Sequence, residues 1–118
     1  MEKLYMKDIS KELGVPEYIL RFYDSKGLFP FFERDENNYR FIKKEKLEWI
    51  KIVLCLKKSG MSLLKIKEYI NLALEGKNTY PKRLQMMIEQ EKIVKQKMKE
   101  LQEQLEYINY KKNLYKNN

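Results

Sequence analysis

Residues 84–115 carry apolar side chains at alternating spacings of three and four, a repeat that places one apolar stripe along an α-helix. The stripe consists of Leu84, Met87, Glu91, Val94, Met98, Leu101, Leu105, Ile108, Lys112 and Tyr115. Of these, only Glu91 and Lys112 are charged, and neither Gly nor Pro follows Pro81. The pattern predicts one helix over residues 80–115, about 54 Å long at about 1.5 Å per residue.

A stripe of this length needs a partner surface that the rest of a small chain cannot supply. We therefore expect a homodimer held together by a coiled coil. The predicted dimer interface consists of Leu84, Met87, Val94, Met98, Leu101, Leu105 and Ile108. Parallel and antiparallel pairing are both open, and a lone solvent-exposed helix is the alternative.

The composition favours a mainly α fold with a nucleic-acid partner. Only 4 Gly and 3 Pro occur in 118 residues, too few for the turns of a strand-rich fold. The 25 Lys and Arg exceed the 17 Asp and Glu, which leaves a net charge of +8 and indicates a polyanionic partner. Residues 40–67 are especially basic.

The sequence also excludes several classes of site. With no His and a single Cys, one chain cannot form a His-based triad, a His-ligated or Cys-rich metal site, or an internal disulfide. No nucleophile–base pair or phosphate-binding Gly-rich loop is present, so we expect neither an enzyme nor a cofactor. The N-terminus lacks the apolar run of a signal peptide, so we expect a cytoplasmic protein without membrane contact.

The first 27 residues predict a helix-turn-helix. Apolar residues recur at helical spacing over residues 6–13, and Gly14 ends that pattern. Pro16 is suited to open a second helix, which Gly27 ends. Two short helices joined by a tight turn form this motif, although an ordinary pair of core helices has the same pattern.

A hairpin is predicted next, followed by two further helices. The aromatic segment 28–34 and the strand-like segment 39–42 flank a turn in which Asn37–Asn38 can form the tip. Helices are expected over residues 44–59 and from an N-cap at Ser62 to Gly76. Residues 1–76 then form one winged helix-turn-helix domain, and residues 77–118 form a linker and the long helix.

An Arg near a Tyr ends the second helix and another Arg–Tyr pair follows the hairpin tip. Arg21 with Tyr23, and Tyr39 with Arg40, offer planar charged groups and hydroxyl donors of the kind that hold phosphate oxygens. If both pairs face one surface, that surface binds a nucleic-acid backbone.

Together these elements resemble the MerR family of bacterial transcription regulators. The resemblance rests on Arg21–Tyr23 with Gly27–Leu28, similar to the family's Arg-Tyr-Tyr…Gly-Leu helix end, and on Asn38–Arg40, similar to its Gly-Tyr-Arg wing. Phe22 lacks the hydroxyl of the family's first Tyr, and Asn38 replaces Gly where a positive backbone angle is expected.

The resemblance implies a dimer that regulates transcription by binding double-stranded promoter DNA and distorting its spacer, acting on RNA polymerase indirectly through the promoter. Glu17 and Tyr18, at the start of the second helix, would then meet base edges, with Glu17 accepting from a cytosine amine. Tyr18 has packing as an equal alternative. Lys43 and Lys57 would add backbone contacts, although a solvated role suits any single lysine of a basic segment.

Cys55 is the one candidate for a chemical switch. A free Cys in a helix usually packs as a small apolar residue, yet Lys51 and Lys58 lie one turn away on either side and would favour a reactive thiolate. The stretch Trp49–Ser62 is similar to the short, single-cysteine family members that respond to aldehydes and electrophiles. This similarity implies covalent modification of Cys55 by aldehydes, electrophiles or oxidants as the signal, within a stress response.

Two other functions use the same residues. An architectural or scaffold protein would coat DNA with the winged domain and join copies through the long helix. A regulator without any effector would follow its own concentration. The operator, the regulated genes, the inducing signal and the sign of regulation are not specified by the sequence.

Overall fold

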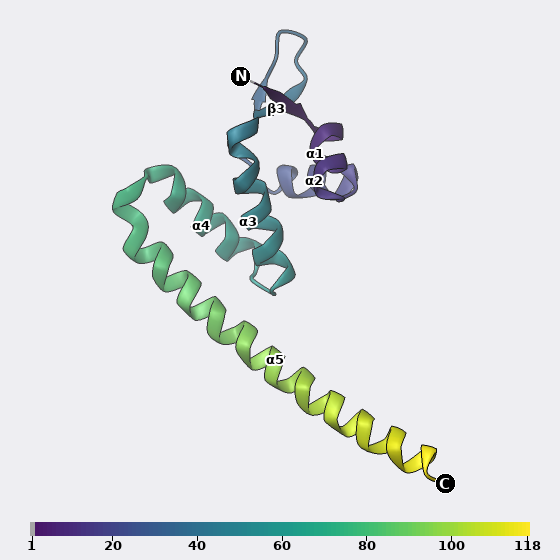
Figure 1. Cartoon of the computed structure of the whole chain (residues 1–118). Coiled ribbons are helices and arrows are strands. Elements are labelled where there is room, and N and C mark those ends of the chain that lie inside the picture. Colours follow the sequence, from purple (N-terminus) through teal and green to yellow (C-terminus); the bar gives the residue numbers. More distant parts are fainter. Residues whose placement is uncertain (1) are drawn as a thin grey trace.

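A computed structural model of the chain describes residues 2–118 as a small winged helical domain from which one long helix projects (Figure 1). The elements are β1 Lys3–Tyr5, α1 Met6–Leu13, α2 Glu17–Ser25, β2 Glu33–Arg34, β3 Arg40–Lys43, η1 Lys44–Lys46, α3 Leu47–Lys58, α4 Leu63–Glu75, η2 Lys77–Thr79 and α5 Tyr80–Lys116. The predicted fold class, a mainly α winged helix-turn-helix followed by a long helix, is therefore confirmed.

The two helices of the helix-turn-helix end and begin where Gly14 and Pro16 predict. Gly14 caps α1 in the left-handed conformation, with φ 66°, and Pro16 stands immediately before α2. The backbone N–H of Val15 donates to the carbonyl of Ser10 at 3.1 Å and so closes the end of α1. This turn sets α2 against α1 with only three residues between the two helices.

A three-stranded antiparallel sheet, in the order β1-β3-β2, forms the base of the wing. Leu4 of β1 pairs with Ile42, and Glu33 of β2 pairs with Phe41. The sequence did not predict β1, because three residues are too few to show an alternating pattern. The aromatic segment 28–34 is strand only at Glu33–Arg34, since its preceding residues enter the core.

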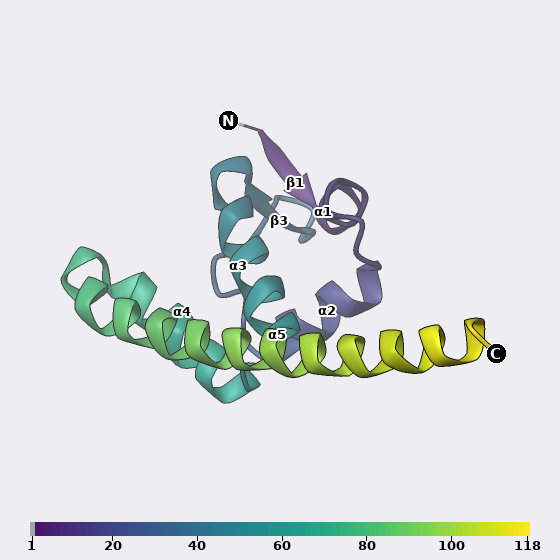
Figure 2. The same cartoon turned by 60° about the horizontal axis from the view of Figure 1, so that its bottom comes forward.

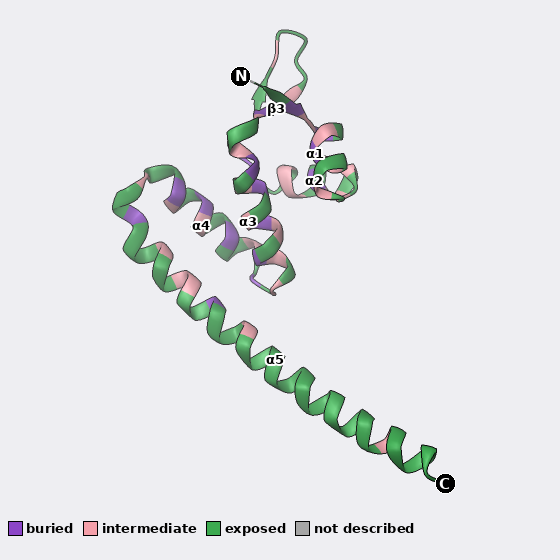
Figure 3. Cartoon of the chain, viewed as in Figure 1, coloured by how far each residue is buried: buried purple, intermediate pink, exposed green. Residues whose placement is uncertain are grey.

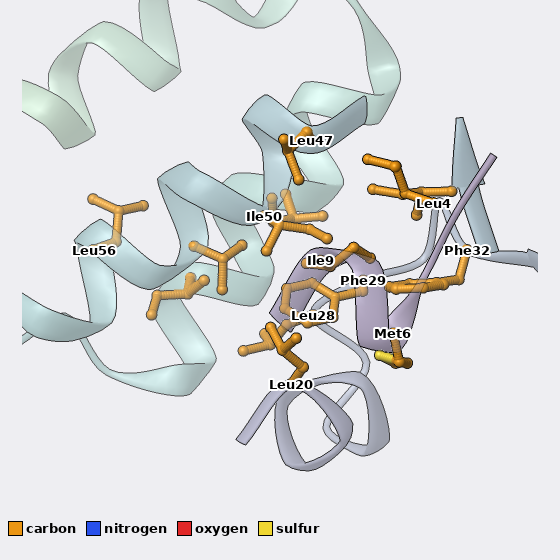
Figure 4. Packing of buried hydrophobic residues seen from close by; sticks show 14 of the residues in the cluster. Leu4, Met6, Ile9, Leu20, Leu28, Phe29, Phe32, Leu47, Ile50 and Leu56 are labelled. Carbon is orange, nitrogen blue, oxygen red and sulfur yellow. The ribbon is translucent and has the colours of Figure 1, made fainter. Parts of the chain in front are cut away.

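The core forms where α1, α2, the aromatic segment and α3 meet. Ile9, Leu20 and Ile50 come from three different helices, have no exposed surface and lie together (Figure 4). Phe29 packs among them and contacts the rings of Phe31 and Phe32 with centroid distances of 5.8 and 5.9 Å. Burial of these apolar groups holds α2 and the wing on one scaffold.

The predicted third and fourth helices are present with small differences. Residues 44–46 form the 3₁₀ turn η1 and α3 proper begins at Leu47. Ser62 caps α4 as predicted, with its hydroxyl accepting from the backbone N–H of Lys65 at 3.2 Å.

The expected linker at residues 77–79 is the packed turn η2. Thr79 is buried, and its hydroxyl lies 2.7 Å from the carbonyl oxygens of both Leu72 and Gly76. Arg83 donates to the same Thr79 hydroxyl and to the Gly76 carbonyl, at 3.0 and 3.1 Å. These bonds tie the start of α5 to the end of α4, so the junction is a defined corner.

The first half of α5 packs on its own domain, whereas the second half does not (Figures 2 and 3). Met87 contacts the apolar core, and Gln90 is only 7% exposed. Gln90 Nε2 donates to the Ser59 carbonyl and hydroxyl oxygens at 3.1 and 2.8 Å, and Lys97 Nζ donates to the same carbonyl at 2.8 Å. Beyond Lys97 the helix runs free, and Met98 is 63% exposed.

Among the helices of residues 2–118, none contains an apolar segment of the length that a membrane span requires.

Candidate nucleic-acid interface

A cleft of about 660 Å³ separates α2 from the wing. Its walls come from β1, the start of α1, α2 and the hairpin: Tyr5, Met6, Lys7, Glu17, Arg21, Asp24, Arg34, Asp35, Asn38, Tyr39 and Arg40. Four of the predicted DNA-binding residues, Glu17, Arg21, Tyr39 and Arg40, therefore lie around one hollow. Side chains that are far apart in the sequence thus share one open surface.

Two aromatic side chains of α2 and the wing are largely exposed. Tyr39, at the wing tip, is 65% exposed, and Tyr18, in the first turn of α2, is 73% exposed. A large aromatic side chain left this exposed gains little packing energy from its own chain and is available to another molecule. For Tyr18 this exposure removes the packing alternative within the described residues 2–118.

Other predicted contact residues lie outside the walls of the cleft. Tyr23 is half-buried, with its ring edge-on to Phe29 at a centroid distance of 6.5 Å. Lys43 belongs to the end of β3 and Lys57 to α3, and both are half-buried. Tyr23 thus combines a packed aromatic body with a position at the end of α2, whereas Lys57 lies on another element.

Arg21 is held by a carboxylate of its own helix. Its Nη2 lies 2.9 Å from Glu17 Oε1, one turn earlier in α2, and both side chains are substantially exposed, at 67% and 40%. Ion pairs with this exposure contribute little to stability because water solvates both partners well. The pair therefore orients the Arg21 side chain but leaves it free to exchange Glu17 for another anionic partner.

Arg40 is held much more firmly, by residues that sequence reasoning did not associate with it. Its Nη2 lies 2.7 Å from Asp24 Oδ1, with side-chain exposures of 31% and 16%, and its guanidinium stacks over the Phe32 ring at 5.1 Å. Its Nε is buried without a hydrogen-bond partner. Arg40 therefore joins the wing to the end of α2, a role that the predicted phosphate contact did not include.

Asp35 organises the tip of the wing. Its Oδ1 accepts from the backbone N–H groups of Asn37 and Tyr39, both at 2.9 Å, and its Oδ2 accepts from the Tyr5 hydroxyl at 2.8 Å. The hydrogen bond from the Tyr39 backbone is the main cause that lowers the pKa of Asp35. The bond to Asp35 raises the pKa of Tyr5.

Asn38 provides the backbone conformation that the hairpin needs. Its φ is 67°, and among residues 2–118 it is the only residue other than Gly with a positive φ. Asn tolerates this left-handed region better than most residues. Arg34 Nη1 donates to the Asn38 carbonyl at 2.9 Å, so the predicted tip at Asn37–Asn38 is confirmed and carries its own brace.

The cleft itself is close to electrically balanced. Its cationic wall residues are Lys7, Arg21, Arg34 and Arg40, and its anionic ones are Glu17, Asp24 and Asp35. The net excess of one positive charge shows that the +8 of the whole chain lies mostly elsewhere. Among the described residues, no group of three Asp, Glu, His or Cys side chains could hold a metal ion.

Cys55 lies away from the cleft, on the exposed face of α3. Its thiol is accessible, in contrast to the buried position that a purely packing role requires. Lys51, one turn earlier, is engaged with Glu48, since its Nζ lies 3.1 Å from Glu48 Oε1. One of the two ammonium groups predicted to activate the thiol therefore has another partner.

Comparisons with known proteins bear on this arrangement. Residues 4–72 match the model of the MerR HTH family regulatory proteins. A helix-turn-helix-type transcriptional regulator from Haemophilus influenzae is 39% identical over 107 residues, which cover 90% of this chain and 78% of that protein.

Two solved structures share most of the fold. A MerR-family transcriptional regulator from Bacillus thuringiensis superposes with a TM-score of 0.88 at 34% identity, covering 93% of this chain and 96% of the other. HiNmlR, a MerR-family regulator that lacks the sensor domain and was solved bound to promoter DNA, gives a TM-score of 0.86 at 34% identity, covering 98% and 91%.

Proposed function

Because the chain belongs to the MerR family of helix-turn-helix transcriptional regulators, we propose that it binds promoter DNA as a homodimer and controls transcription from that promoter. The similarity to HiNmlR in its promoter-bound form, over 98% of this chain, is the observation that carries this proposal. The open cleft between α2 and the wing supports the proposal because it brings four predicted DNA-binding residues of both elements onto one surface.

In this proposal α2 and the wing make different contacts with DNA. Glu17 and Tyr18, in the first turn of α2, would contact base edges in the major groove. Arg21 and Tyr23 would hold phosphates from the end of the same helix. Tyr39 would do so from the wing tip, where its side chain is exposed.

Arg40 would contribute in two ways. Its ion pair with Asp24 fixes the distance between wing and α2, and the exposed part of its guanidinium can meet a phosphate. Lys43 and Lys57 would add weaker electrostatic contacts along the same backbone.

The long helix would set the spacing of the two half-sites. In this proposal the stripe from Leu84 to Ile108 pairs with that of a second copy, while Met87 is already partly covered by its own domain. Two winged domains held at a fixed separation can keep the promoter spacer bent or unwound, at a deformation cost on the order of 1–6 kcal/mol. RNA polymerase would sense that change through the DNA.

Footprinting across the genome tests this function against the architectural alternative. A regulator protects a small set of short pseudo-palindromic sites, each bound by one dimer, with strong dependence of affinity on salt. Uniform coverage of many unrelated sequences would instead support a DNA-coating protein. Absence of binding to any DNA would contradict both.

A cysteine switch is favoured by one specific observation, the exposure of Cys55 one turn before the contact of α3 with α5. The backbone N–H of Ser59 donates to the Cys55 carbonyl at 2.9 Å, and Ser59 in turn accepts from Gln90 and Lys97. An adduct formed on the thiol by an aldehyde, electrophile or oxidant would thus lie close to the contact that orients α5.

Two measurements test the switch. Mass spectrometry of the intact protein after exposure to candidate electrophiles should show an adduct on Cys55, and a Cys55→Ser variant should lose the transcriptional response while still binding DNA. A full response from that variant would leave a regulator without a cysteine switch.

A further inference from the structure

Glu17 occupies a position that a simple DNA-binding surface would leave to a neutral or cationic residue. We infer that Glu17 is a specificity-determining residue that holds Arg21 away from phosphate until the correct base is present. This inference rests on the proposed binding of DNA by α2. It concerns how the protein discriminates against DNA sequences other than its operator.

The two ion-paired arginines of the cleft, Arg21 and Arg40, differ in how easily they can be released from their carboxylates. Arg40 is paired with the largely buried Asp24 at 2.7 Å and stacked on Phe32, so its position is fixed. The Arg21–Glu17 pair is open to water on both sides. An exposed pair of this kind exchanges its partner at little cost, so Arg21 can move to a phosphate more easily than Arg40 can.

Movement of Arg21 leaves Glu17 as a free carboxylate beside a polyanion. Electrostatic repulsion from the phosphates then opposes binding unless another donor replaces the guanidinium. The N4 amine of cytosine is the base-edge donor that a carboxylate accepts from in the major groove. A cytosine in reach of Glu17 therefore permits the exchange, while other bases at that position leave the carboxylate unpaired.

The charges of the cleft agree with this account. Its cationic and anionic wall residues nearly cancel, although the whole chain carries +8. Non-specific binding depends mainly on the number of phosphates that are neutralised. Two of the four cations, Arg21 and Arg40, are already in ion pairs, which lowers the affinity of the cleft for arbitrary DNA. The correct sequence then contributes a larger share of the binding.

The Glu17→Gln variant tests the inference because it keeps the shape of the side chain and removes its charge. On DNA of random sequence we expect affinity to rise about three- to tenfold, and the slope of log K against log salt to steepen by about 0.9, one added phosphate contact. On the operator, the preference for its C·G pair under Glu17 should fall about tenfold. Glu75→Gln is the matched control, because it removes the same charge from an exposed position on α4 outside the cleft.

A rise in affinity in Glu17→Gln has two possible causes, the release of Arg21 or the general loss of a negative charge. Repeating the measurement in an Arg21→Ala variant distinguishes them. Both charge-removing changes are made in the Arg21→Ala protein. If Glu17 acts by holding Arg21, Glu17→Gln should then raise the affinity for random-sequence DNA no more than Glu75→Gln does. An equal rise in both backgrounds, or no rise in either, would overturn the inference. Failure of the unaltered protein to bind any DNA would instead contradict the proposed function, and thermal unfolding confirms that the compared variants are folded.

Discussion

Two amphipathic regions of this molecule reach stability by different routes. In the winged domain, residues such as Ile9, Leu20 and Ile50 are covered completely by other parts of the same chain. In the distal half of α5, Leu101 and Leu105 repeat with equal regularity but remain 63% and 50% exposed (Figure 3). The same kind of sequence pattern therefore specifies a core within the chain in one region, whereas in the other it leaves an exposed stripe that forms the interface between chains in the proposed dimer.

Replacing both Leu101 and Leu105 by Asp gives the largest effect expected from this contrast. Each buried leucine contributes about 1.5–3 kcal/mol, so a dimer that loses four of them is weakened by about 6–12 kcal/mol. Sedimentation equilibrium should find a monomer whose winged domain keeps its near-ultraviolet circular dichroism.

The matched control adds two acids to the same helix off the stripe, as Gln96→Asp with Lys99→Asp. That variant should remain dimeric. A dimer that survives the Leu101 and Leu105 changes would place the interface elsewhere.

Ile50→Ala tests the core of the winged domain. The side chain has no exposed surface, so its truncation should lower the free energy of unfolding by about 2–5 kcal/mol. Measured by urea in the monomeric Leu101/Leu105 background, the loss should not depend on protein concentration. Leu64→Ala, at an 80% exposed position of α4, should change stability by about 0.5 kcal/mol or less.

Gln90→Ala acts at the border between the two regions. It removes the two hydrogen bonds to Ser59, worth about 0.5–1.5 kcal/mol each, and so loosens α5 from the end of α3. Hydrogen exchange should speed up in the first half of α5 more than in α3. Gln96→Ala, at an exposed position of the same helix, should leave exchange unchanged.

The smallest effect expected is the pH dependence of the wing. The pKa of Asp35 is lowered from 3.8, so its contribution is present above that value and is lost as pH falls through the lowered pKa. The pKa of Tyr5 is raised from 10.0, so its contribution is present below that value and is lost as pH rises through the raised pKa. After correction for intrinsic exchange, Tyr39 amide protection should be greatest between these limits.

Tyr5→Phe separates the two ends of that range. It should remove the alkaline loss of protection while the acidic loss remains, because Asp35 still accepts from two backbone N–H groups. If Tyr39 amide protection in Tyr5→Phe were still lost at high pH, the Tyr5 hydroxyl would not be the group that stabilises the wing.

The local signals were sufficient to predict most of the fold. Gly14, Pro16, Ser62 and Gly76 mark helix ends through backbone conformation or capping, and each marks one here. The wing tip was predicted for the same reason, since Asn38 tolerates a positive φ. Such signals act within a few residues, so a single sequence shows them directly.

The contacts that define the site act across longer distances and were not predicted. Asp24 and Arg40 are sixteen residues apart, and Ser59 and Gln90 are thirty-one apart. Nothing in the local pattern marks Gln90, a polar residue on a polar flank, as buried. Four of the eleven cleft residues were thus predicted as DNA contacts from their type and position, whereas the other seven and the ion-pair partners depended on the tertiary arrangement.

The anchoring of α5 at Ser59 makes the helix a lever. Lys97 is its last side chain bonded to that point, and residues 98–116 continue for about 28 Å at about 1.5 Å per residue. A tilt of about 10° at the anchor would therefore displace the far end by about 5 Å, more than the step of about 3.4 Å between base pairs. In the proposed dimer, a change too small to disturb the domain itself can thus shift its register on DNA by more than one base pair.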